Sequence, residues 1–217
     1  MSEIGGLYVL IDPAACKGRS PVAVAEAALK GGASMIQWRD KLRDKGEQLA
    51  EARAIYALCR AHDAVFIAND HADMALALGM AVAPRGGIGV HVGQKDLPLV
   101  VVKRLLPSTF VIGVSTNNRE EALAAESGGA TYVAVGDLFG TTAKEGTRAA
   151  SPARLAEVKS AVRVPVIGIG GINRRNLAEV IDAGADGVAV ISAVCGADDP
   201  ESAARELVEA FRAARRA

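Results

Sequence analysis

The sequence is poor in aromatic residues, cysteine and net charge, and each shortage argues against a class of protein. Phe, Trp and Tyr make up only 4% of the 217 residues, so small side chains must fill most of the core. The three cysteines, Cys16, Cys59 and Cys195, are scattered and form no CxxC pair, which argues against a disulfide framework and fits a reducing cytoplasm. The 25 basic and 25 acidic residues cancel, which gives no electrostatic reason to bind nucleic acid or an anionic membrane.

Long apolar runs are also missing. No run reaches the ~18 residues of a membrane span, and the first residues lack the charged-then-apolar pattern of a signal segment. Half of the chain is nevertheless hydrophobic and 23 residues are glycine, which favours helices packed closely on a buried sheet. We expect a cytoplasmic protein without nucleic-acid or membrane partners, folded as one domain over residues 1–217.

Short runs rich in Val, Ile and Ala alternate with longer segments that carry charge at helical spacing. Eight such pairs predict a (β/α)8 TIM barrel with parallel strands and right-handed crossovers. A doubly wound open sheet is the alternative, but no GxGxxG motif opens the first helix. The expected strands are 7–12, 34–40, 65–70, 89–93, 110–115, 132–137, 165–170 and 187–192. The expected helices lie near 21–31, 44–62, 72–79, 98–106, 118–128, 152–161, 173–183 and 200–215.

Active sites of such barrels lie at the carboxyl ends of the strands, so polar residues there are the candidates. Gln37, Arg39 and Lys41 share one face at the end of the second expected strand if Ile36 and Trp38 face the helices. Arg and Lys are ordinarily solvated charges. Arg39 and Lys41, however, directly follow a buried run and alternate on the face that points inward. We therefore expect them to lie in the mouth of the barrel.

The third, fourth and fifth strands also end in polar residues. Asn69 and Asp70 end the third strand, and Asp96 follows the fourth. Carboxylates at adjacent strand ends can hold an oxygen-preferring cation such as Mg²⁺, although each could instead cap the next helix. Ser115 ends the fifth strand, and we expect it to form hydrogen bonds because no His and acid are placed to activate it. His91, inside the fourth strand, is expected to be packed or hydrogen-bonded.

The last loops of the barrel predict phosphate binding. Gly170 and Gly171 follow the seventh strand and Ser192 follows the eighth, and barrels often bind a phosphate with backbone N–H groups of these loops. The polar loop 139–147 follows the sixth strand, where barrels place mobile lids, and its Lys144 could reach a phosphate. A surface loop without a ligand is the alternative for that segment.

These residues stand in blocks that resemble the thiamine-phosphate synthase (thiamine-phosphate pyrophosphorylase) family. The blocks occur in family order over most of the chain, at 36–41, 68–77, 89–98, 112–115, 135–144 and 169–193. The resemblance implies a Mg²⁺-assisted transferase that couples 4-amino-2-methyl-5-hydroxymethylpyrimidine diphosphate to 4-methyl-5-hydroxyethylthiazole phosphate. Diphosphate would leave first, and the thiazole nitrogen would then capture the pyrimidine-methyl cation to give thiamine phosphate.

The resemblance also implies roles for the candidate residues, and it is compatible with a homodimer. The metal ligands would be Asp70 and Asp96. The diphosphate would be bound by Arg39, Lys41, Asn69 and Lys144. The pyrimidine would be oriented by Gln37 and Ser115, and Thr141 would contact substrate from the lid. The thiazole phosphate would be held by Gly170, Gly171, Ile191 and Ser192. The catalytic residues would be Arg39, Lys41, Lys144 and Ser115.

Three departures from the family pattern keep two other functions open. The lid reads Gly140-Thr141-Thr142-Ala143-Lys144 without the usual proline, Asn117 replaces a frequent His, and residues 80–87 look like an insertion at the bottom of the barrel. A thiazole tautomerase-like isomerase would need the phosphate loops but not the carboxylate pair. A catalytically silent barrel that binds thiamine phosphate is also compatible with the altered lid.

Overall fold

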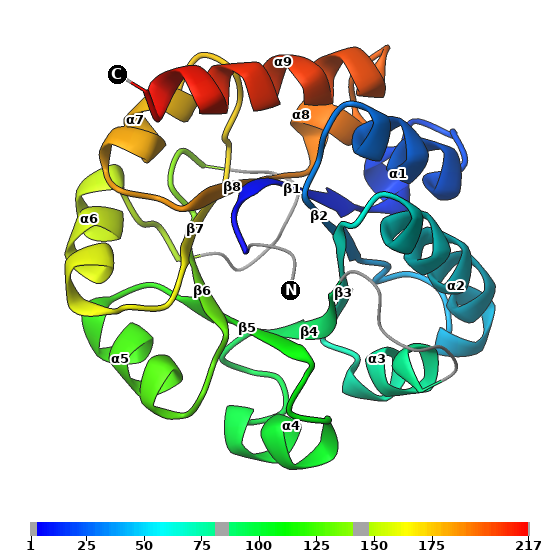
Figure 1. Cartoon of the computed structure of the whole chain (residues 1–217), viewed down its shortest axis with the longest axis horizontal. Helices are drawn as coiled ribbons and strands as arrows, with labels where there is room; N and C mark the ends of the chain where they lie inside the picture. The colour runs from blue at the N-terminus through cyan, green and yellow to red at the C-terminus, as the bar shows by residue number, and fades with distance from the viewer. Residues whose placement is uncertain (1–3, 81–86, 141–147, 217) are drawn as a thin grey trace.

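The computed structural model describes residues 4–80, 87–140 and 148–216, which form a closed parallel barrel surrounded by helices (Figure 1). The strands are β1 (Gly6–Ile11), β2 (Met35–Trp38), β3 (Val65–Asn69), β4 (Ile88–Val92), β5 (Val111–Thr116), β6 (Tyr132–Val135), β7 (Val166–Ile169) and β8 (Gly187–Val190). The helices are η1 (Pro13–Ala15), α1 (Pro21–Lys30), α2 (Lys45–Ala61), α3 (Ala72–Gly79), α4 (Leu99–Leu105), α5 (Arg119–Ser127), α6 (Pro152–Ala161), α7 (Leu177–Asp182), α8 (Ser192–Cys195) and α9 (Pro200–Ala214). The (β/α)8 barrel expected from the sequence is confirmed.

Pairing between the first and last strands closes the sheet. β1 is parallel to β2 on one side and to β8 on the other, so that Tyr8 lies opposite Met35 and Ala189. This closure excludes the doubly wound open sheet. Because the strands are parallel, their carboxyl ends meet at one rim of the barrel, which is where the polar strand ends of the sequence gather.

Alternation along the strands creates two separate cores. In β1, Leu7, Val9 and Ile11 pack in the layer between barrel and helices, whereas Tyr8 and Leu10 fill the interior of the barrel. β2 confirms the predicted parity, because Ile36 and Trp38 lie in the outer layer. The buried inner cluster consists of Tyr8, Leu10, Met35, Val65, Ile67, Val111, Tyr132, Ala134, Ile167 and Ala189.

Local sequence signals set the helix boundaries. α1, α6 and α9 each begin with proline, which suits the first helical position because the N–H it lacks has no partner there. The preceding side chains of Ser20, Ser151 and Asp199 accept hydrogen bonds from the first turns. No helix in the described part of the chain is long and apolar enough to cross a lipid bilayer.

Several boundaries differ from the expected ones. Strands β2, β6 and β8 end two residues earlier than expected, at Trp38, Val135 and Val190, and the residues that follow belong to the loops at the rim. η1 and α8 were not expected, since three or four residues are too few to show a periodic pattern. α3 ends at Gly79 and β4 begins at Ile88, and residues 81–86 of the suspected insertion lie outside the described residues.

Replacing Gly89 with Ala should destabilise the barrel. A Cβ at this position in β4 would stand 1.8 Å from the carbonyl oxygen of Val111 and 2.6 Å from its carbonyl carbon, both of them backbone atoms that cannot move independently. We expect G89A to lower the free energy of unfolding by roughly 1–3 kcal/mol or more in urea titrations. Gly46 in α2 is the matched control, since a Cβ there meets nothing within 4 Å and G46A should be neutral or slightly stabilising. Equal stabilities of the two variants would contradict this account.

Candidate active site

The carboxyl rim contains a buried ion pair between the first two strands. Arg39, which follows β2, donates from Nη1 to the carboxylate of Asp12, which follows β1, and each residue is only 8% exposed. Sequence reasoning placed Arg39 in the mouth but did not identify this partner. Asp12 continues the inward parity of Tyr8 and Leu10, and that alternation is the signal that could have revealed it. The pair uses one of the five N–H donors of the guanidinium.

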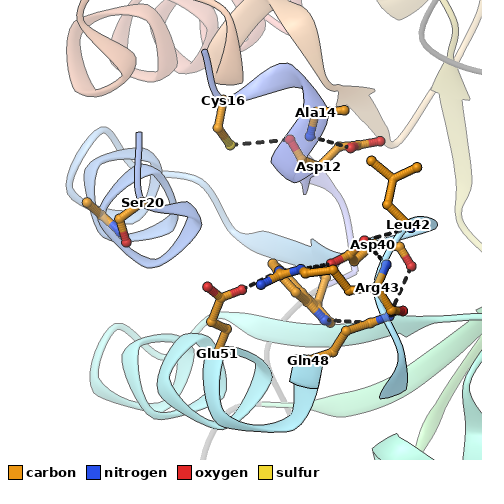
Figure 2. A network of polar contacts seen from close by, with 11 residues as sticks. Asp12, Ala14, Cys16, Ser20, Asp40, Leu42, Arg43, Gln48 and Glu51 are labelled. Carbon is orange, nitrogen blue, oxygen red and sulfur yellow. Dashed lines mark hydrogen bonds and ion pairs between the residues drawn. The ribbon is translucent and has the colours of Figure 1, made fainter. Parts of the chain in front are cut away.

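A second polar network fixes the loop between β2 and α2 (Figure 2). Arg43 bridges Asp40, at 2.5 Å from Nε, and Glu51 of α2, at 2.6 Å from Nη2. The two carboxylates raise the pKa of Arg43, Glu51 contributing the most. Gln48 accepts a hydrogen bond from the indole of Trp38 at 3.2 Å and donates to the Arg43 carbonyl at 2.6 Å. This loop carries Lys41, so the network holds the segment from which that lysine reaches the rim.

Three of the predicted site residues meet at the ends of β2 and β3. Lys41 Nζ lies 2.8 Å from Asp70 Oδ2, and the Asn69 amide donates to the same oxygen at 2.7 Å. Asp70 adopts a left-handed backbone conformation with φ +61°, while its N–H donates to the His91 carbonyl of β4 at 2.8 Å. The strained backbone is held between two strands, and it presents the carboxylate to a lysine and an amide.

The alternative reading of Asp70 and Asp96 as helix caps is not supported. The N-cap of α3 is His71 and that of α4 is Pro98, and neither helix has a side-chain cap hydrogen bond. Asp96 Oδ2 instead accepts from the Gly93 N–H at 2.8 Å, within the turn that follows β4. Both carboxylates therefore stand at neighbouring strand ends without a role in starting a helix.

The carboxylates of Asp70 and Asp96 fit a Mg²⁺ ion whose remaining ligands are water and substrate oxygens. Mg²⁺ in proteins is commonly bound by one or two carboxylates together with substrate phosphates. The described side-chain hydrogen bonds of Asp70 and Asp96 all involve Oδ2. Among residues 4–80, 87–140 and 148–216, no group of three or more His, Cys, Asp and Glu could form a protein-only metal site.

A chain of hydrogen bonds crosses the interior of the barrel from β2 to β5. Gln37 Nε2 lies 2.5 Å from the Tyr8 hydroxyl, which lies 3.0 Å from the Tyr132 hydroxyl. Tyr132 is 3.0 Å from His91 Nδ1, and His91 Nε2 is 2.8 Å from Ser115 Oγ. Burial raises the pKa of both tyrosines, so they remain neutral hydroxyl groups. Sequence reasoning did not identify His91 as the partner of Ser115; β4 and β5 are adjacent and bring the two together.

One consistent arrangement of protons satisfies the whole chain. The Gln37 amide nitrogen donates to the Tyr8 hydroxyl, which leaves the Tyr8 proton for Tyr132 and the Tyr132 proton for His91 Nδ1. In that arrangement His91 carries its proton on Nε2 and donates to Ser115 Oγ. Ser115 keeps its own O–H to donate elsewhere, which makes it a hydrogen-bond donor at the rim and not an activated nucleophile.

At the other end of the chain, Gln37 presents an acceptor that lacks a donor. Gln37 is only 2% exposed, and its Oε1 has no hydrogen-bond partner among the described residues. A buried acceptor without a partner is costly, and in a native structure it calls for a ligand or water. The site therefore has a position that an N–H group of a small molecule would satisfy.

The loops after β7 and β8 lie next to each other, as Ile169 and Ala189 are paired in the sheet. Gly170 has φ +104°, and a Cβ there would lie 2.1 Å from Asp137 Oδ1, so this loop packs closely against the one that follows β6. The Gly171 carbonyl accepts hydrogen bonds from the Asn173 and Asn176 amides at 3.2 and 3.0 Å. Ile191 precedes α8, which begins with Ser192.

The segment after β6 is described only at its two ends, and the predicted Thr141 and Lys144 lie outside the described residues. Asn117 joins those ends, because its side-chain amide contacts the carbonyl oxygens of Gly136, Arg148 and Ala149 at 3.0–3.2 Å. Its neighbour Asn118 is the residue that caps α5. Asn117, at the position where the family often has His, thus connects β5 to the base of this loop.

The fold and the polar rim define a (β/α)8-barrel enzyme, and comparison with known proteins defines it further. Residues 7–194 match the family model of thiamine monophosphate synthase. The thiamine-phosphate synthase of Methanospirillum hungatei is 44% identical over 206 residues, covering 94% of this chain and 96% of that protein. The corresponding protein of Chlorobium limicola is 47% identical over 194 residues, covering 88% and 89%. The structure of thiamine phosphate pyrophosphorylase from Pyrococcus furiosus matches with a TM-score of 0.85 and 37% identity over 96% of each chain.

The chain belongs to the thiamine monophosphate synthase family and is a transferase of that type. The family resemblance expected from the motifs is therefore confirmed. The assignment of individual residues to metal, diphosphate and heterocycles stays a prediction.

Replacing Asp12 with Asn should destabilise the protein by leaving the Arg39 guanidinium buried without a counter-charge. Loss of one partner from a buried pair typically costs 3–5 kcal/mol, so we expect a fall of about that size in the free energy of unfolding. Asn keeps the Oδ1 that accepts from the Ala14 N–H, so the variant removes the charge selectively. Glu26→Gln, in the exposed pair with Lys30 at 2.7 Å, is the control and should cost less than about 1 kcal/mol. A D12N loss no larger than that of E26Q would overturn the charge-compensation role.

Proposed function

We propose that this protein couples 4-amino-2-methyl-5-hydroxymethylpyrimidine diphosphate to 4-methyl-5-hydroxyethylthiazole phosphate, releasing diphosphate and forming thiamine phosphate. Family membership supports the reaction type. The observation that carries the assignment to this site is Gln37 Oε1, a buried acceptor that lacks a donor among the described residues. An amino group on the pyrimidine is a donor suited to that position.

The pyrimidine is bound in this proposal between the two ends of the cross-barrel chain. Gln37 accepts from the amino group, and Ser115 donates its remaining O–H to an acceptor of the heterocycle. His91, Tyr132 and Tyr8 keep both end groups in fixed orientations because each is bonded to the next. A rigid polar frame of this kind positions the reacting methylene group without a covalent intermediate on the protein.

The diphosphate is bound at the neighbouring rim by Arg39, Lys41 and Asn69, and by Lys144 from the loop after β6. Positioned cations stabilise the negative charge that grows on a leaving group, an effect worth several kcal/mol in enzymes. Asp70 and Asp96 would hold Mg²⁺, which neutralises diphosphate oxygens when bound. Lys41 and Asn69 already contact Asp70, so the leaving-group cations and the metal ligand form one cluster.

The thiazole phosphate is held across the barrel, at the loops after β7 and β8. Gly170 and Gly171 allow close approach to the backbone, Ile191 and Ser192 lie at the start of α8, and Thr141 contacts substrate from the loop after β6. The substrates are small phosphorylated molecules, and we assign no nucleic-acid or membrane partner. A cytoplasmic location and a homodimer stay predictions of the composition and of the family resemblance.

The proposal is tested by a coupling assay on the purified protein with both heterocyclic phosphates, with and without Mg²⁺. We expect thiamine phosphate and diphosphate to form in equal amounts and only with the metal. Asp96→Ala should lower kcat roughly 100- to 1,000-fold, since it removes one electrostatic group of the reaction, while the unfolding midpoint stays close to that of the wild type. Asp73→Ala, an exposed aspartate paired with Lys45, is the control and should remain active.

Two outcomes would contradict the proposal. Absence of product from folded protein would favour the tautomerase-like or silent-barrel alternatives. Full Mg²⁺-dependent activity of D96A would refute the metal role of Asp96 while leaving the transferase assignment in place.

Replacing Lys41 with Gln should strengthen metal binding while weakening catalysis. In the described structure Lys41 neutralises Asp70, so a metal that arrives without diphosphate has to compete with the ammonium group. An exposed pair contributes about 0.2–1 kcal/mol, so we expect K41Q to bind Mn²⁺ up to about fivefold more tightly in the absence of diphosphate, measured by electron paramagnetic resonance. Lys45→Gln, which breaks the equivalent 2.9 Å pair with Asp73, should leave Mn²⁺ binding unchanged. Unchanged or weaker binding by K41Q would refute the competition.

A further inference from the structure

Two cysteines from opposite ends of the chain lie together beside the seam of the barrel. Cys16 follows η1, which comes directly after β1, and Cys195 is the last residue of α8, which comes directly after β8. Their side chains are close neighbours. Each also lies 3.3 Å from a carbonyl oxygen of the β1 region, Cys16 from that of Asp12 and Cys195 from that of Leu10. Figure 2 shows the Cys16 thiol directed to the Asp12 carbonyl.

The backbones of the two cysteines are also joined through a single side chain. The Arg19 guanidinium donates from Nε to the Cys16 carbonyl at 3.1 Å and from Nη2 to the Cys195 carbonyl at 2.7 Å. Its Nη1 donates to the Ala197 carbonyl at 2.6 Å. Because a guanidinium is planar and rigid, these bonds hold the segment after β1 and the end of α8 at a fixed separation. The proximity of the two cysteines thus rests on anchoring of their backbones by Arg19.

The two thiols differ in reactivity, and the third cysteine is isolated from them. The neighbouring Cys195 side chain lowers the pKa of Cys16, which favours the thiolate that reacts in thiol–disulfide exchange. Cys59 lies in α2, where burial raises the pKa of its thiol. All three cysteines are buried free thiols, so Cys59 is a matched control of equal burial without a thiol neighbour.

We propose that Cys16 and Cys195 form a dithiol that oxidises to an intramolecular disulfide and covalently joins the segments after β1 and β8. The oxidant is a low-molecular-weight disulfide. The Cys16 thiolate attacks one sulfur of that molecule and forms a mixed disulfide, releasing the first small thiol. Cys195 then loses its proton and attacks the Cys16 sulfur, forming the protein disulfide and releasing the second small thiol. Two electrons pass from the protein to the oxidant, and two small thiols take up the two protons.

The consequence of this bond is a covalent link across the place where the barrel closes. β1 and β8 are the two strands whose pairing completes the ring, and they are held otherwise by hydrogen bonds and packing. A disulfide between the segments that follow β1 and β8 would keep these two segments together in the unfolded chain and so restrict its conformations. We expect the oxidised protein to have a higher thermal midpoint than the reduced protein, a difference that dithiothreitol reverses.

The test treats folded wild-type protein with oxidised glutathione and then alkylates it under denaturing conditions. The expected result is one alkylated cysteine, Cys59, and a peptide map in which Cys16 and Cys195 are linked. Cys59→Ser should form the same link and show the same rise in midpoint, whereas C16S and C195S should form none. Coupling activity, measured separately, reports on the proposed function independently of this result.

Three results would overturn the inference. They are recovery of three alkylated cysteines after prolonged oxidation, a disulfide that includes Cys59, and glutathione adducts that never resolve to an internal bond. A correctly linked protein with an unchanged or lower midpoint would overturn the seam-linking role.

Discussion

Pairing of β1 with β8 is the constraint on which the site depends. Once the ring is closed, eight parallel strands present their carboxyl ends at one rim, and residues that are distant in sequence become neighbours there. Asp12 meets Arg39 across the first pair of strands, and Asp70 meets Lys41 across the second. Alternation then sorts side chains between the barrel interior and the helix layer. The order of the strands and the alternation of their side chains thus decide which residues meet at the site.

The interior of the barrel combines an apolar cluster with a polar chain, and the two have different tasks. The apolar side chains fill the volume, whereas the hydroxyl, imidazole and amide groups satisfy one another so that their burial is tolerated. Within this polar chain, Gln37 Oε1 is the atom without a hydrogen-bond partner among the described residues. An acceptor left without a donor costs about 1–3 kcal/mol, and a ligand N–H that reaches it recovers that free energy. The hydrogen-bond acceptor that Gln37 leaves without a donor is thus a source of binding energy for a ligand.

Sequence patterns were sufficient for the barrel and for the polar residues that its strand ends bring to one rim. Runs of Val, Ile and Ala alternating with helical segments placed eight strands, and the inward parity of Gln37 followed from Trp38 facing the helices. Partnerships across strands could not be read, because register decides them: Asp12 with Arg39, and His91 with Ser115, are separated in sequence and meet only through pairing. For the same reason, the sequence did not show that Cys16 and Cys195 lie close together. Thr141 and Lys144 lie outside the described residues, so their placement stays a prediction.

The hydrogen-bond chain from Gln37 to Ser115 also constrains how the sequence can change. Each member has to offer a donor or an acceptor that matches its neighbour, so a replacement that removes the match leaves two like groups facing each other in a buried space. Single replacements within Tyr8, Tyr132 and His91 are therefore unfavourable, whereas paired replacements that reverse the whole direction are compatible with the same volume. Relatives with a different residue at one of these positions should carry a compensating difference at the adjoining one. The residues of this hydrogen-bond chain should therefore change together among related sequences.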